Sequence, residues 1–371
     1  MTDVTPPSRI FNFSAGPAVL PEPVLEEAQR DLVALPGVGS SVLEVSHRSK
    51  VVTEIVETAE ANIRALAALP EDVHVLFLQG GATQQFAMAP MNLLPDDGAA
   101  DYVVTGSWAK KAAKEAELFG AARIAASTEA EAFARVPKAS ELALSPDAAY
   151  VHVTSNNTIY GTQWEVLPDT GDVPLVVDAS SDIFSRPLDM ARDGIGLVYA
   201  GAQKNLGPAG VTVVLVRKDL VQRADALSRT IPTMLRYSTY AASQSLYNTP
   251  PVFAIYLVGL VAKWLVAQGG LEAMAERNAR KAQKLYAAID RTDFYRGTAQ
   301  PDSRSLMNVT MRLPSETLEA RFIKEATAAG LAGLKGHRSV GGVRASIYNA
   351  CPEAGVDALV DFMIQFERAN G

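Results

Sequence analysis

The chain alternates short runs of apolar residues with longer segments in which apolar residues recur every three or four positions. These two patterns are typical of buried strands and of amphipathic helices, respectively. Strands are predicted at residues 73–78, 100–106, 149–154, 174–178, 195–200 and 211–217. Helices are predicted at residues 21–35, 50–69, 82–94, 108–119 and 251–268. The repeated strand-then-helix order predicts an α/β fold, in which a mostly parallel sheet is flanked by helices.

The C-terminal part of the chain follows a different pattern. Gly269 and Gly270 end the helix at 251–268, and glycines are typical of a helix C-terminus. Beyond them, helices are predicted at 271–289 and 318–329, and strands at 307–312 and 343–348. We therefore predict a large domain at 21–268, a smaller α+β domain at 269–371, and an N-terminal arm at 1–20 that packs against the smaller domain. The alanine-rich segment 121–134 has the composition of a helix.

Composition narrows the class of protein. Of the 371 residues, 48% are hydrophobic and 20% are charged, which is typical of a folded globular enzyme. The net charge of −7 argues against nucleic acid as a partner, because phosphate backbones bind to basic surfaces. The most apolar run, 252–262, is too short to span a membrane, and the N-terminus lacks the apolar core of a signal peptide. Cys351 is the sole cysteine, so no intrachain disulfide forms and we expect a cytoplasmic protein.

Lys204 occupies an unusual position, in a glycine- and proline-rich turn between the strands predicted at 195–200 and 211–217. A solvated turn lysine is the ordinary explanation, because a charged amine is almost never buried without a partner. The alternative is a Schiff-base lysine, whose pKa falls on burial so that the free amine attacks a carbonyl. The ends of the other strands help to decide between these explanations.

Four other strand ends carry groups that suit one cofactor. Gly80 and Gly81 join a strand to a helix, where free backbone N–H groups bind a phosphate. Asp178 ends an apolar strand and suits a cationic ring nitrogen, although aspartate also caps helices. Trp108 either stacks on a flat ring or fills the core, and the polar cluster 155–158 supplies hydroxyl groups. Since the carboxyl ends of parallel strands meet at one edge of a sheet, these groups predict a pyridoxal phosphate site.

Ten short segments together resemble the phosphoserine aminotransferases, which are class V aminotransferases of fold type I. The segments run from residue 13 to residue 350 in the order found in that family. They are 13–17 (FSAGP), 46–49 (SHRS), 78–82 (LQGGA), 106–108 (GSW), 154–158 (TSNNT), 177–181 (VDASS), 200–205 (AGAQKN), 247–251 (YNTPP), 336–339 (GHRS) and 344–350 (RASIYNA). The resemblance therefore covers nearly the whole chain.

The resemblance implies pyridoxal 5′-phosphate as the cofactor and gives roles to particular residues. Lys204 is implied to form the Schiff base and to carry the proton, Asp178 to pair with the ring nitrogen, and Trp108 to stack on the ring. Thr158 is implied to bond near the 3-hydroxyl of the ring. The residues implied to hold the phosphate are Ala82, Thr83, Gln203 and, from a second subunit, Asn248 and Thr249. A homodimer with shared active sites follows. Several family members carry Arg where this chain has Thr83.

Basic residues in the matched segments are implied to bind the substrates. The family transfers the amino group of L-glutamate to 3-phosphohydroxypyruvate, giving 2-oxoglutarate and O-phosphoserine, by a ping-pong mechanism in serine biosynthesis. Arg344 is implied to clamp the α-carboxylate. The residues implied to bind the distal phosphate or carboxylate are His47, Arg48, His337 and Arg338. Some relatives also use 4-phosphohydroxythreonine in vitamin B6 synthesis.

Two alternatives stay open at this point. One is another class V enzyme, either of the alanine–glyoxylate type or a cysteine desulfurase, although Cys351 lies where a core residue of the small domain is expected. The other is a non-catalytic regulator that keeps the fold alone, and the joint presence of Lys204, Asp178 and Trp108 argues against it. No metal site is predicted.

Overall fold

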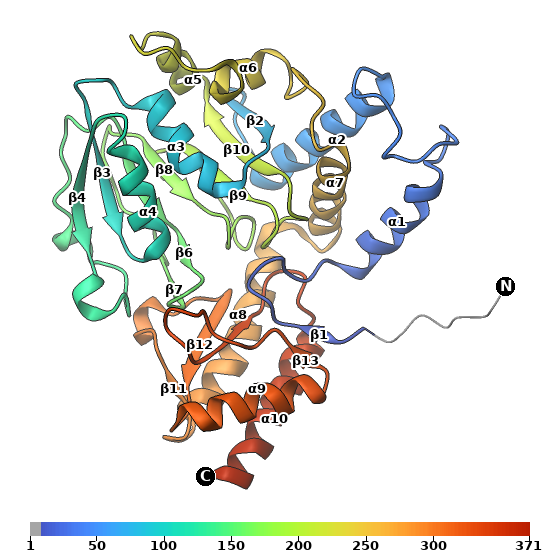
Figure 1. Cartoon of the computed structure of the whole chain (residues 1–371), viewed down its shortest axis with the longest axis vertical. Coiled ribbons are helices and arrows are strands. Elements are labelled where there is room, and N and C mark those ends of the chain that lie inside the picture. Colours follow the sequence, from blue (N-terminus) through green and yellow to red (C-terminus); the bar gives the residue numbers. More distant parts are fainter. Residues whose placement is uncertain (1–8) are drawn as a thin grey trace.

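A seven-stranded sheet forms the centre of the chain, of which the computed structural model describes residues 9–371 (Figure 1). The strand order is β2, β10, β9, β8, β5, β3, β4, and only β10 is antiparallel to its neighbours. The strands are β2 (Val73–Leu78), β3 (Ala99–Val104), β4 (Ala121–Ser127), β5 (Val151–Thr154), β8 (Leu175–Asp178), β9 (Ile195–Gly201) and β10 (Thr212–Arg217). The predicted α/β fold with a mostly parallel sheet is therefore confirmed.

Helices cover both faces of this sheet. Along β2, Val75 and Phe77 belong to one buried cluster, whereas Leu76 and Leu78 belong to another, as the two-residue period of a strand requires. The first cluster includes α1 (Glu22–Val33), α2 (Lys50–Ala67) and α7 (Val252–Ala267). The second includes α3 (Gly81–Leu93), α4 (Ser107–Ala116), α5 (Lys218–Asp225) and α6 (Tyr237–Ala242). The central strands β8 and β9 are consequently buried along their whole length.

The alanine-rich segment 121–134 contains a strand, so the helix that its composition suggested is wrong. Ala121–Ser127 forms β4, which pairs in parallel with β3 at the edge of the sheet. Within β4 only Ala125 is fully buried. The helix preference of alanine amounts to less than about 1 kcal/mol per residue, so the hydrogen bonds of a sheet edge outweigh it.

The C-terminal residues form a separate layer below the large sheet (Figure 1). A three-stranded antiparallel sheet, in the order β11, β12, β14, packs with three helices. These elements are β11 (Arg296–Gly297), β12 (Asn308–Arg312), β14 (Val343–Ser346), α8 (Gly270–Asp290), α9 (Glu316–Ala328) and α10 (Glu353–Asn370). We call residues 21–268 and 269–371 the large and the small domain, a division that stays a prediction.

The N-terminal arm lies beside the small domain. Its strand β1 (Phe11–Asn12) pairs in parallel with β13 (Leu331–Ala332), and the Phe13 carbonyl accepts a hydrogen bond from the Ser346 N–H. The first eight residues of the predicted arm lie outside the described residues.

Among residues 9–371 no single helix is both long and apolar enough to cross a membrane. Helices α7 and α8 reach the required length and hydropathy only when they are taken together, and the angle between them is 83°.

Lys281, on α8, is fully buried and has no carboxylate partner within residues 9–371. Its amine donates hydrogen bonds to three backbone carbonyls, those of Ile347 (2.8 Å), Tyr348 (2.7 Å) and Cys351 (3.2 Å). Burial lowers the pKa of Lys281 to about 8. The small domain therefore contains a cation that fixes the turn after β14 at the cost of desolvation.

This cost predicts a specific pH dependence of stability. Because the pKa of Lys281 is lower in the folded protein than the ordinary 10.5, the unfolded chain binds more protons between these two values. The desolvation penalty is thus complete below pH 8 and is relieved as pH rises toward 10.5. We expect the free energy of unfolding of the wild type to rise by about 2 kcal/mol, relative to Lys281→Met, between pH 7.5 and 9.5. Urea denaturation of both proteins measures the difference, and parallel pH profiles would contradict the assignment.

Candidate active site

Lys204 lies in the loop between β9 and β10, beneath the N-terminal arm. A Cβ atom on Gly16 would lie 3.3 Å from Lys204 Cγ, and the Ala18 N–H donates to the Gln203 carbonyl at 2.9 Å. Burial lowers the pKa of the Lys204 amine, and the Asp178 carboxylate opposes this shift. Lys204 is therefore not a solvated turn lysine, and its free amine is accessible at a lower pH than that of an exposed lysine.

Asp178 is the last residue of β8, and it is 5% exposed. Its Oδ1 accepts hydrogen bonds from Ser180, at 3.0 Å from the backbone N–H and 2.7 Å from the hydroxyl. No hydrogen bond within residues 9–371 uses its Oδ2. Burial raises the pKa of Asp178, and the charge of Lys204 opposes the shift. The free oxygen of this buried carboxylate thus suits a cationic partner such as a protonated ring nitrogen.

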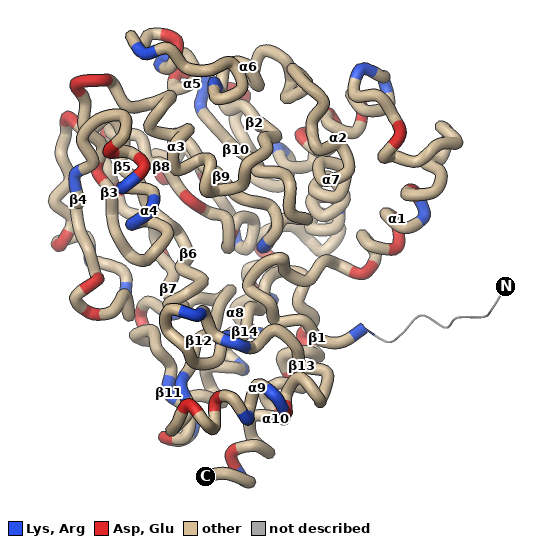
Figure 2. The backbone as a smooth tube through the Cα atoms, in the orientation of Figure 1, with Lys and Arg blue, Asp and Glu red and all other residues tan. Residues whose placement is uncertain are grey.

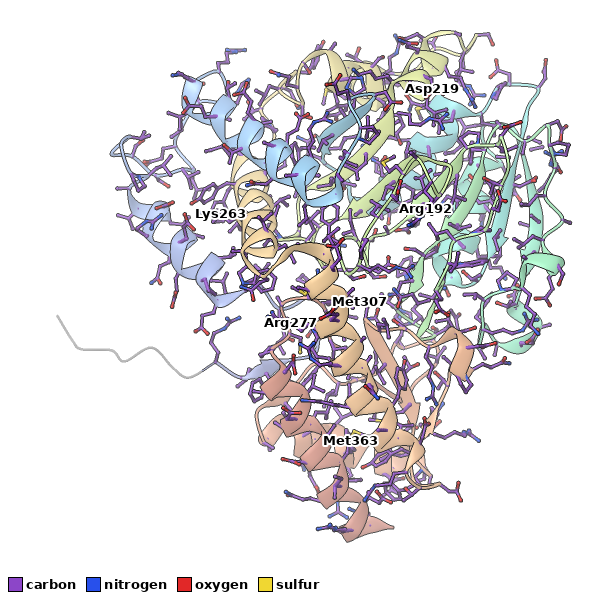
Figure 3. The ribbon with its side chains drawn as sticks, turned by 180° about the vertical axis from the view of Figure 1, so that it is seen from behind. Arg192, Asp219, Lys263, Arg277, Met307 and Met363 are labelled. Carbon is purple, nitrogen blue, oxygen red and sulfur yellow. The ribbon has the colours of Figure 1, made fainter. Side chains whose placement is uncertain are left out.

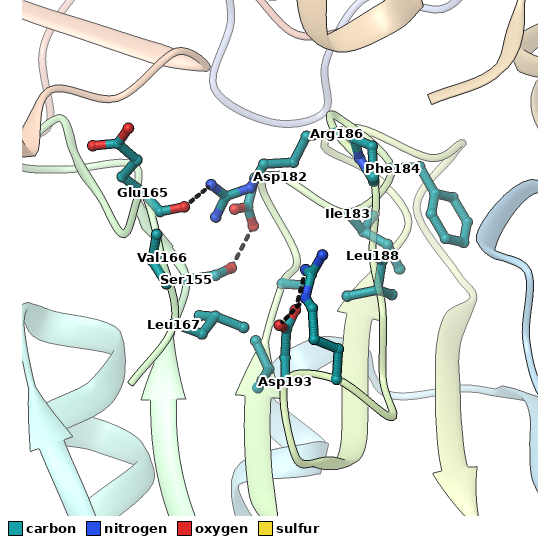
Figure 4. A pocket seen from close by; sticks show the side chains of 14 residues that line it. Ser155, Glu165, Val166, Leu167, Asp182, Ile183, Phe184, Arg186, Leu188 and Asp193 are labelled. Atoms are coloured by element: carbon teal, nitrogen blue, oxygen red, sulfur yellow. Dashed lines mark hydrogen bonds and ion pairs between the residues drawn. The ribbon is translucent and has the colours of Figure 1, made fainter. Parts of the chain in front are cut away.

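A second buried carboxylate, Asp182, lies in the loop after β8 and borders a cavity of about 340 Å³ (Figure 4). Its Oδ1 accepts a hydrogen bond from the Ser155 hydroxyl, and its Oδ2 accepts one from Gln163 Nε2 at 3.2 Å. Both oxygens of Asp182 are therefore occupied. This difference favours Asp178 over Asp182 as the group that faces a cofactor ring.

The N-terminus of α3 forms the expected anion site. Gly80 and Gly81 have φ values of +89° and +66°, in the left-handed region that favours glycine, and no side chain caps the helix. The first backbone N–H groups of α3, including those of Ala82 and Thr83, are thus left for a ligand. A Cβ atom on Gly201 would lie 3.4 Å from Ala82 N and 2.8 Å from Gln203 Oε1. The absence of a side chain at Gly201 therefore leaves space where Gln203 and the helix terminus meet.

Trp108, Thr158 and Arg344 form a connected group between the two domains. Trp108 Nε1 donates to the Thr158 hydroxyl at 3.3 Å, and Arg344 Nη1 donates to the Thr158 carbonyl at 2.9 Å. The Lys204 amine lies 5.6 Å from the centroid of the Trp108 ring. These contacts bring residues that follow three strands of the large domain next to a residue of β14.

The guanidinium of Arg344 has no acidic partner among the residues that the structure describes. Its Nε is buried without a hydrogen-bond partner, and no salt bridge within residues 9–371 involves it. Burial lowers the pKa of its guanidinium. His337 lies close by, and burial, followed by the charges of Arg344, Arg338 and Lys111, lowers the pKa of that imidazole. Figure 2 shows basic segments at β14 and below β9, where the two domains meet. This surplus of positive charge favours an anionic substrate.

The other predicted basic pair belongs to a different part of the chain. His47 Nδ1 and the Thr249 hydroxyl are hydrogen-bonded at 3.0 Å, close to the starts of α2 and α7. Arg48, Asn248 and Thr249 are exposed. No hydrogen bond or ion pair described for residues 9–371 connects these residues to Lys204. The structure thus groups nine of the predicted site residues with Lys204, whereas the remaining four, His47, Arg48, Asn248 and Thr249, form a separate group.

Some residues of the site were given no role from the sequence alone. Lys111 Nζ lies 4.8 Å from the centroid of the Trp108 ring, one helical turn along α4 from Trp108. Ser180 is hydrogen-bonded to Asp178, and the N-terminal arm covers Lys204 at Gly16. The spacing of Trp108 and Lys111 could have identified the lysine, because residues three apart on a helix share a face. The covering arm depends on contacts between distant segments.

The site fits pyridoxal phosphate by the groups that it leaves unpaired. The free carboxylate oxygen of Asp178 suits the ring nitrogen, and the uncapped N-terminus of α3 suits the phosphate. The ring of Trp108, which lies next to the Lys204 amine, suits the plane of the cofactor ring. The unpaired guanidinium of Arg344 corresponds to a substrate carboxylate. Cys351 is 2% exposed, and burial raises the pKa of its thiol to about 11, so it does not suit the nucleophile of a desulfurase.

Comparison with known proteins agrees with this geometry. The family model for class V aminotransferases matches residues 10–359. The phosphoserine aminotransferase of Desulfatibacillum aliphaticivorans is 56% identical over 366 residues, which cover 98% of this chain and 99% of that protein. The solved phosphoserine aminotransferase from Bacillus circulans subsp. alkalophilus has a TM-score of 0.94 and 54% identity, with 98% and 99% of the two chains covered. The pyridoxal-phosphate-bound enzyme from Trichomonas vaginalis has a TM-score of 0.91 and 38% identity, with 96% and 100% covered.

The family model covers almost the whole chain, and so do relatives whose sequences are more than 50% identical to it. The resemblance found from ten short segments is thereby confirmed, as is pyridoxal phosphate as the cofactor. The chain belongs to the class V aminotransferases and, within them, to the phosphoserine aminotransferases.

Proposed function

We propose that the protein transfers the amino group of L-glutamate to 3-phosphohydroxypyruvate, giving 2-oxoglutarate and O-phospho-L-serine. The observation that carries this proposal is the unpaired, partly buried guanidinium of Arg344 in the same site as Lys204 and Asp178. The names of relatives at 56% and 58% identity over 98% of the chain support the choice of substrates. The reaction would supply serine biosynthesis in the cytoplasm, and 4-phosphohydroxy-L-threonine is a second candidate substrate of the same charge pattern.

The residues around Lys204 would hold the cofactor as follows. The N–H groups of Ala82 and Thr83 and the amide of Gln203 would bind its phosphate, with Asn248 and Thr249 supplied by a second subunit. Asp178 would pair with the ring nitrogen, Trp108 would stack on the ring, and Thr158 would lie near the 3-hydroxyl. The bound cofactor supplies an electron sink that makes loss of the substrate Cα proton possible.

Lys204 performs the proton transfer in this proposal. Burial lowers the pKa of its amine, which favours the free base, and the charge of Asp178 opposes this shift. In the first half-reaction its Nζ would take the proton from Cα of the bound amino acid and deliver it to the C4′ carbon of the cofactor, and in the second half-reaction it would carry a proton back to Cα of the new amino acid. Gly16, next to Lys204, and Ala18, bonded to the Gln203 carbonyl, would help to exclude water from this side of the site.

Arg344 orients the substrate for this step. Its guanidinium is held by the Thr158 carbonyl at 2.9 Å, which leaves other N–H groups for a bidentate bond with the α-carboxylate. His337 and Arg338 then meet the distal anion. L-glutamate and O-phosphoserine both carry an α-carboxylate and a distal anion, so one set of basic residues serves both halves of a ping-pong cycle.

A homodimer completes the site in this account. His47 is bonded to Thr249, and these residues, together with Arg48 and Asn248, lie near the starts of α2 and α7, separate from Lys204 of the same chain. Exposed apolar side chains occur in the neighbouring segments, among them Val33 (82% exposed), Leu43 (62%) and Tyr247 (58%). A second subunit that covers these side chains would bring its own basic pair to the site of the first.

The first prediction concerns catalysis by Lys204. With pyridoxal phosphate bound, the protein should form 2-oxoglutarate from L-glutamate and 3-phosphohydroxypyruvate. Lys204→Ala should lower the turnover about 100- to 10,000-fold, because the base that moves the proton is absent. The variant should still bind the cofactor, which absorbance after gel filtration will measure. Near wild-type turnover in Lys204→Ala would remove the lysine from its role.

The second prediction concerns the distal anion. Arg338→Ala should lower kcat/KM for O-phosphoserine about 10- to 100-fold, since a charged hydrogen bond to the phosphate is lost. L-alanine has no distal anion, so its kcat/KM as an amino donor should change less than about twofold. Arg321→Ala, which removes an exposed cation paired with Glu325, is the matched control. Equal losses for both donors would place Arg338 outside the distal pocket.

A further inference from the structure

Three buried asparagines occupy the junction of the two domains, immediately behind Lys204. They are Asn205 (6% exposed), Asn278 on α8 (0%) and Asn349 in the turn after β14 (2%). Asn205 is the next residue after Lys204 in the chain. We call these three residues the asparagine bridge. None of them has a role in the function proposed above.

Asn205 joins two segments of the active site. Its Nδ2 donates to the Ile183 carbonyl at 2.7 Å, in the loop that follows Asp178, and its Oδ1 accepts from the Asn349 N–H at 2.9 Å. Figure 4 shows Ile183 on this loop. Because the amide group is bonded at both ends, the backbone that carries Lys204 is fixed simultaneously to the large domain and to the small one.

Asn349 extends the connection into the small domain. Its Nδ2 donates to the Phe184 carbonyl at 2.8 Å, and its Oδ1 accepts from Asn278 Nδ2 at 2.8 Å. Asn278 Nδ2 also lies 3.0 Å from the Ser185 carbonyl. Seen from behind, α8 extends from this junction into the small domain, with Arg277 labelled near its start (Figure 3). The turn after β14 is therefore held by α8 on one side and by the loop 183–185 on the other.

The same turn is connected to Arg344. This arginine lies on β14, and the chain passes from it through Ser346 to Asn349 within five residues. Lys281 further fixes the intervening segment through the carbonyls of Ile347 and Tyr348. The asparagine bridge consequently links the backbone of Lys204 to the backbone of Arg344 by hydrogen bonds that are almost completely buried.

We propose that Asn205 is a positioning residue, which acts through its bond to Asn349 to hold the small domain so that Arg344 lies at the working distance from Lys204. The inference rests on the proposed roles of Lys204 and Arg344. Buried amides need partners in any fold, but here the partners belong to the two segments that carry the base and the carboxylate clamp. A shift of one domain relative to the other would alter substrate orientation without removing any group that touches substrate.

A double-mutant cycle between Asn205→Ala and Arg344→Lys tests this inference. The quantity measured is kcat/KM for the half-reaction of the cofactor-loaded enzyme with L-glutamate. We expect Asn205→Ala to lower it about tenfold in the wild type, mainly through KM, but less than about twofold when Arg344 is already replaced. The control is Tyr295→Phe, which removes a buried hydrogen bond to the Met363 carbonyl in the small domain, away from the active site. Its effect on kcat/KM should add to that of Arg344→Lys.

A second readout needs neither cofactor nor substrate. In the cofactor-free protein, hydrogen exchange of residues 347–351 should be faster in Asn205→Ala than in Tyr295→Phe, because the Asn349 N–H has lost its acceptor. Asn205→Ser, whose short side chain does not span both partners, repeats the measurements if the alanine variant does not fold. If Arg344→Lys lowers kcat/KM but its effect adds to that of Asn205→Ala, the role of Asn205 is overturned and the role of Arg344 is kept. An unchanged rate in Arg344→Lys would overturn the role of Arg344 and this inference with it.

Discussion

The active site depends on the electrostatic relation between two desolvated groups, the carboxylate of Asp178 and the amine of Lys204. Burial raises the pKa of the acid and lowers that of the base, and each charge opposes the shift of the other. Ser180 occupies only one oxygen of Asp178. The site thus keeps a carboxylate oxygen that can accept from a cationic ring and an amine that can act as a base. An exposed lysine would stay protonated at a pH where an exposed aspartate is ionised, and burial lowers the lysine pKa.

The arrangement of the sheet explains how these groups meet. Every strand of the large sheet except β10 runs in one direction, so the ends of β2, β3, β5, β8 and β9 lie at a single edge. The small domain closes this edge through Arg344, which bonds to Thr158, and through the asparagine bridge behind Lys204. In the proposed mechanism Arg344 of the small domain binds the substrate carboxylate and Lys204 of the large domain moves the proton, so the junction between the domains would position the substrate.

Much of this could be predicted from the sequence, because the strand ends follow directly from hydrophobic periodicity. Asp178, Lys204 and the glycines before α3 occupy positions where a local pattern changes from strand to turn. The covering of Lys204 by Gly16 and the bond between Asn205 and Asn349 join residues more than 140 positions apart, and no local pattern encodes such pairs. The error at 121–134 has the same origin, since pairing with β3 outweighs the local preference of alanine.

Lys204, which is half-buried, and Lys281, which is fully buried, both have lowered pKa values, and a direct test shows which of them binds the cofactor. Lys281 donates to three carbonyls within the small domain, whereas Lys204 faces Trp108 at the sheet edge. Borohydride reduction of the cofactor-loaded protein, followed by peptide mass spectrometry, identifies the lysine that forms the covalent link. We expect a single modified peptide, which contains Lys204. Modification at Lys281, or no modified lysine at all, would contradict it.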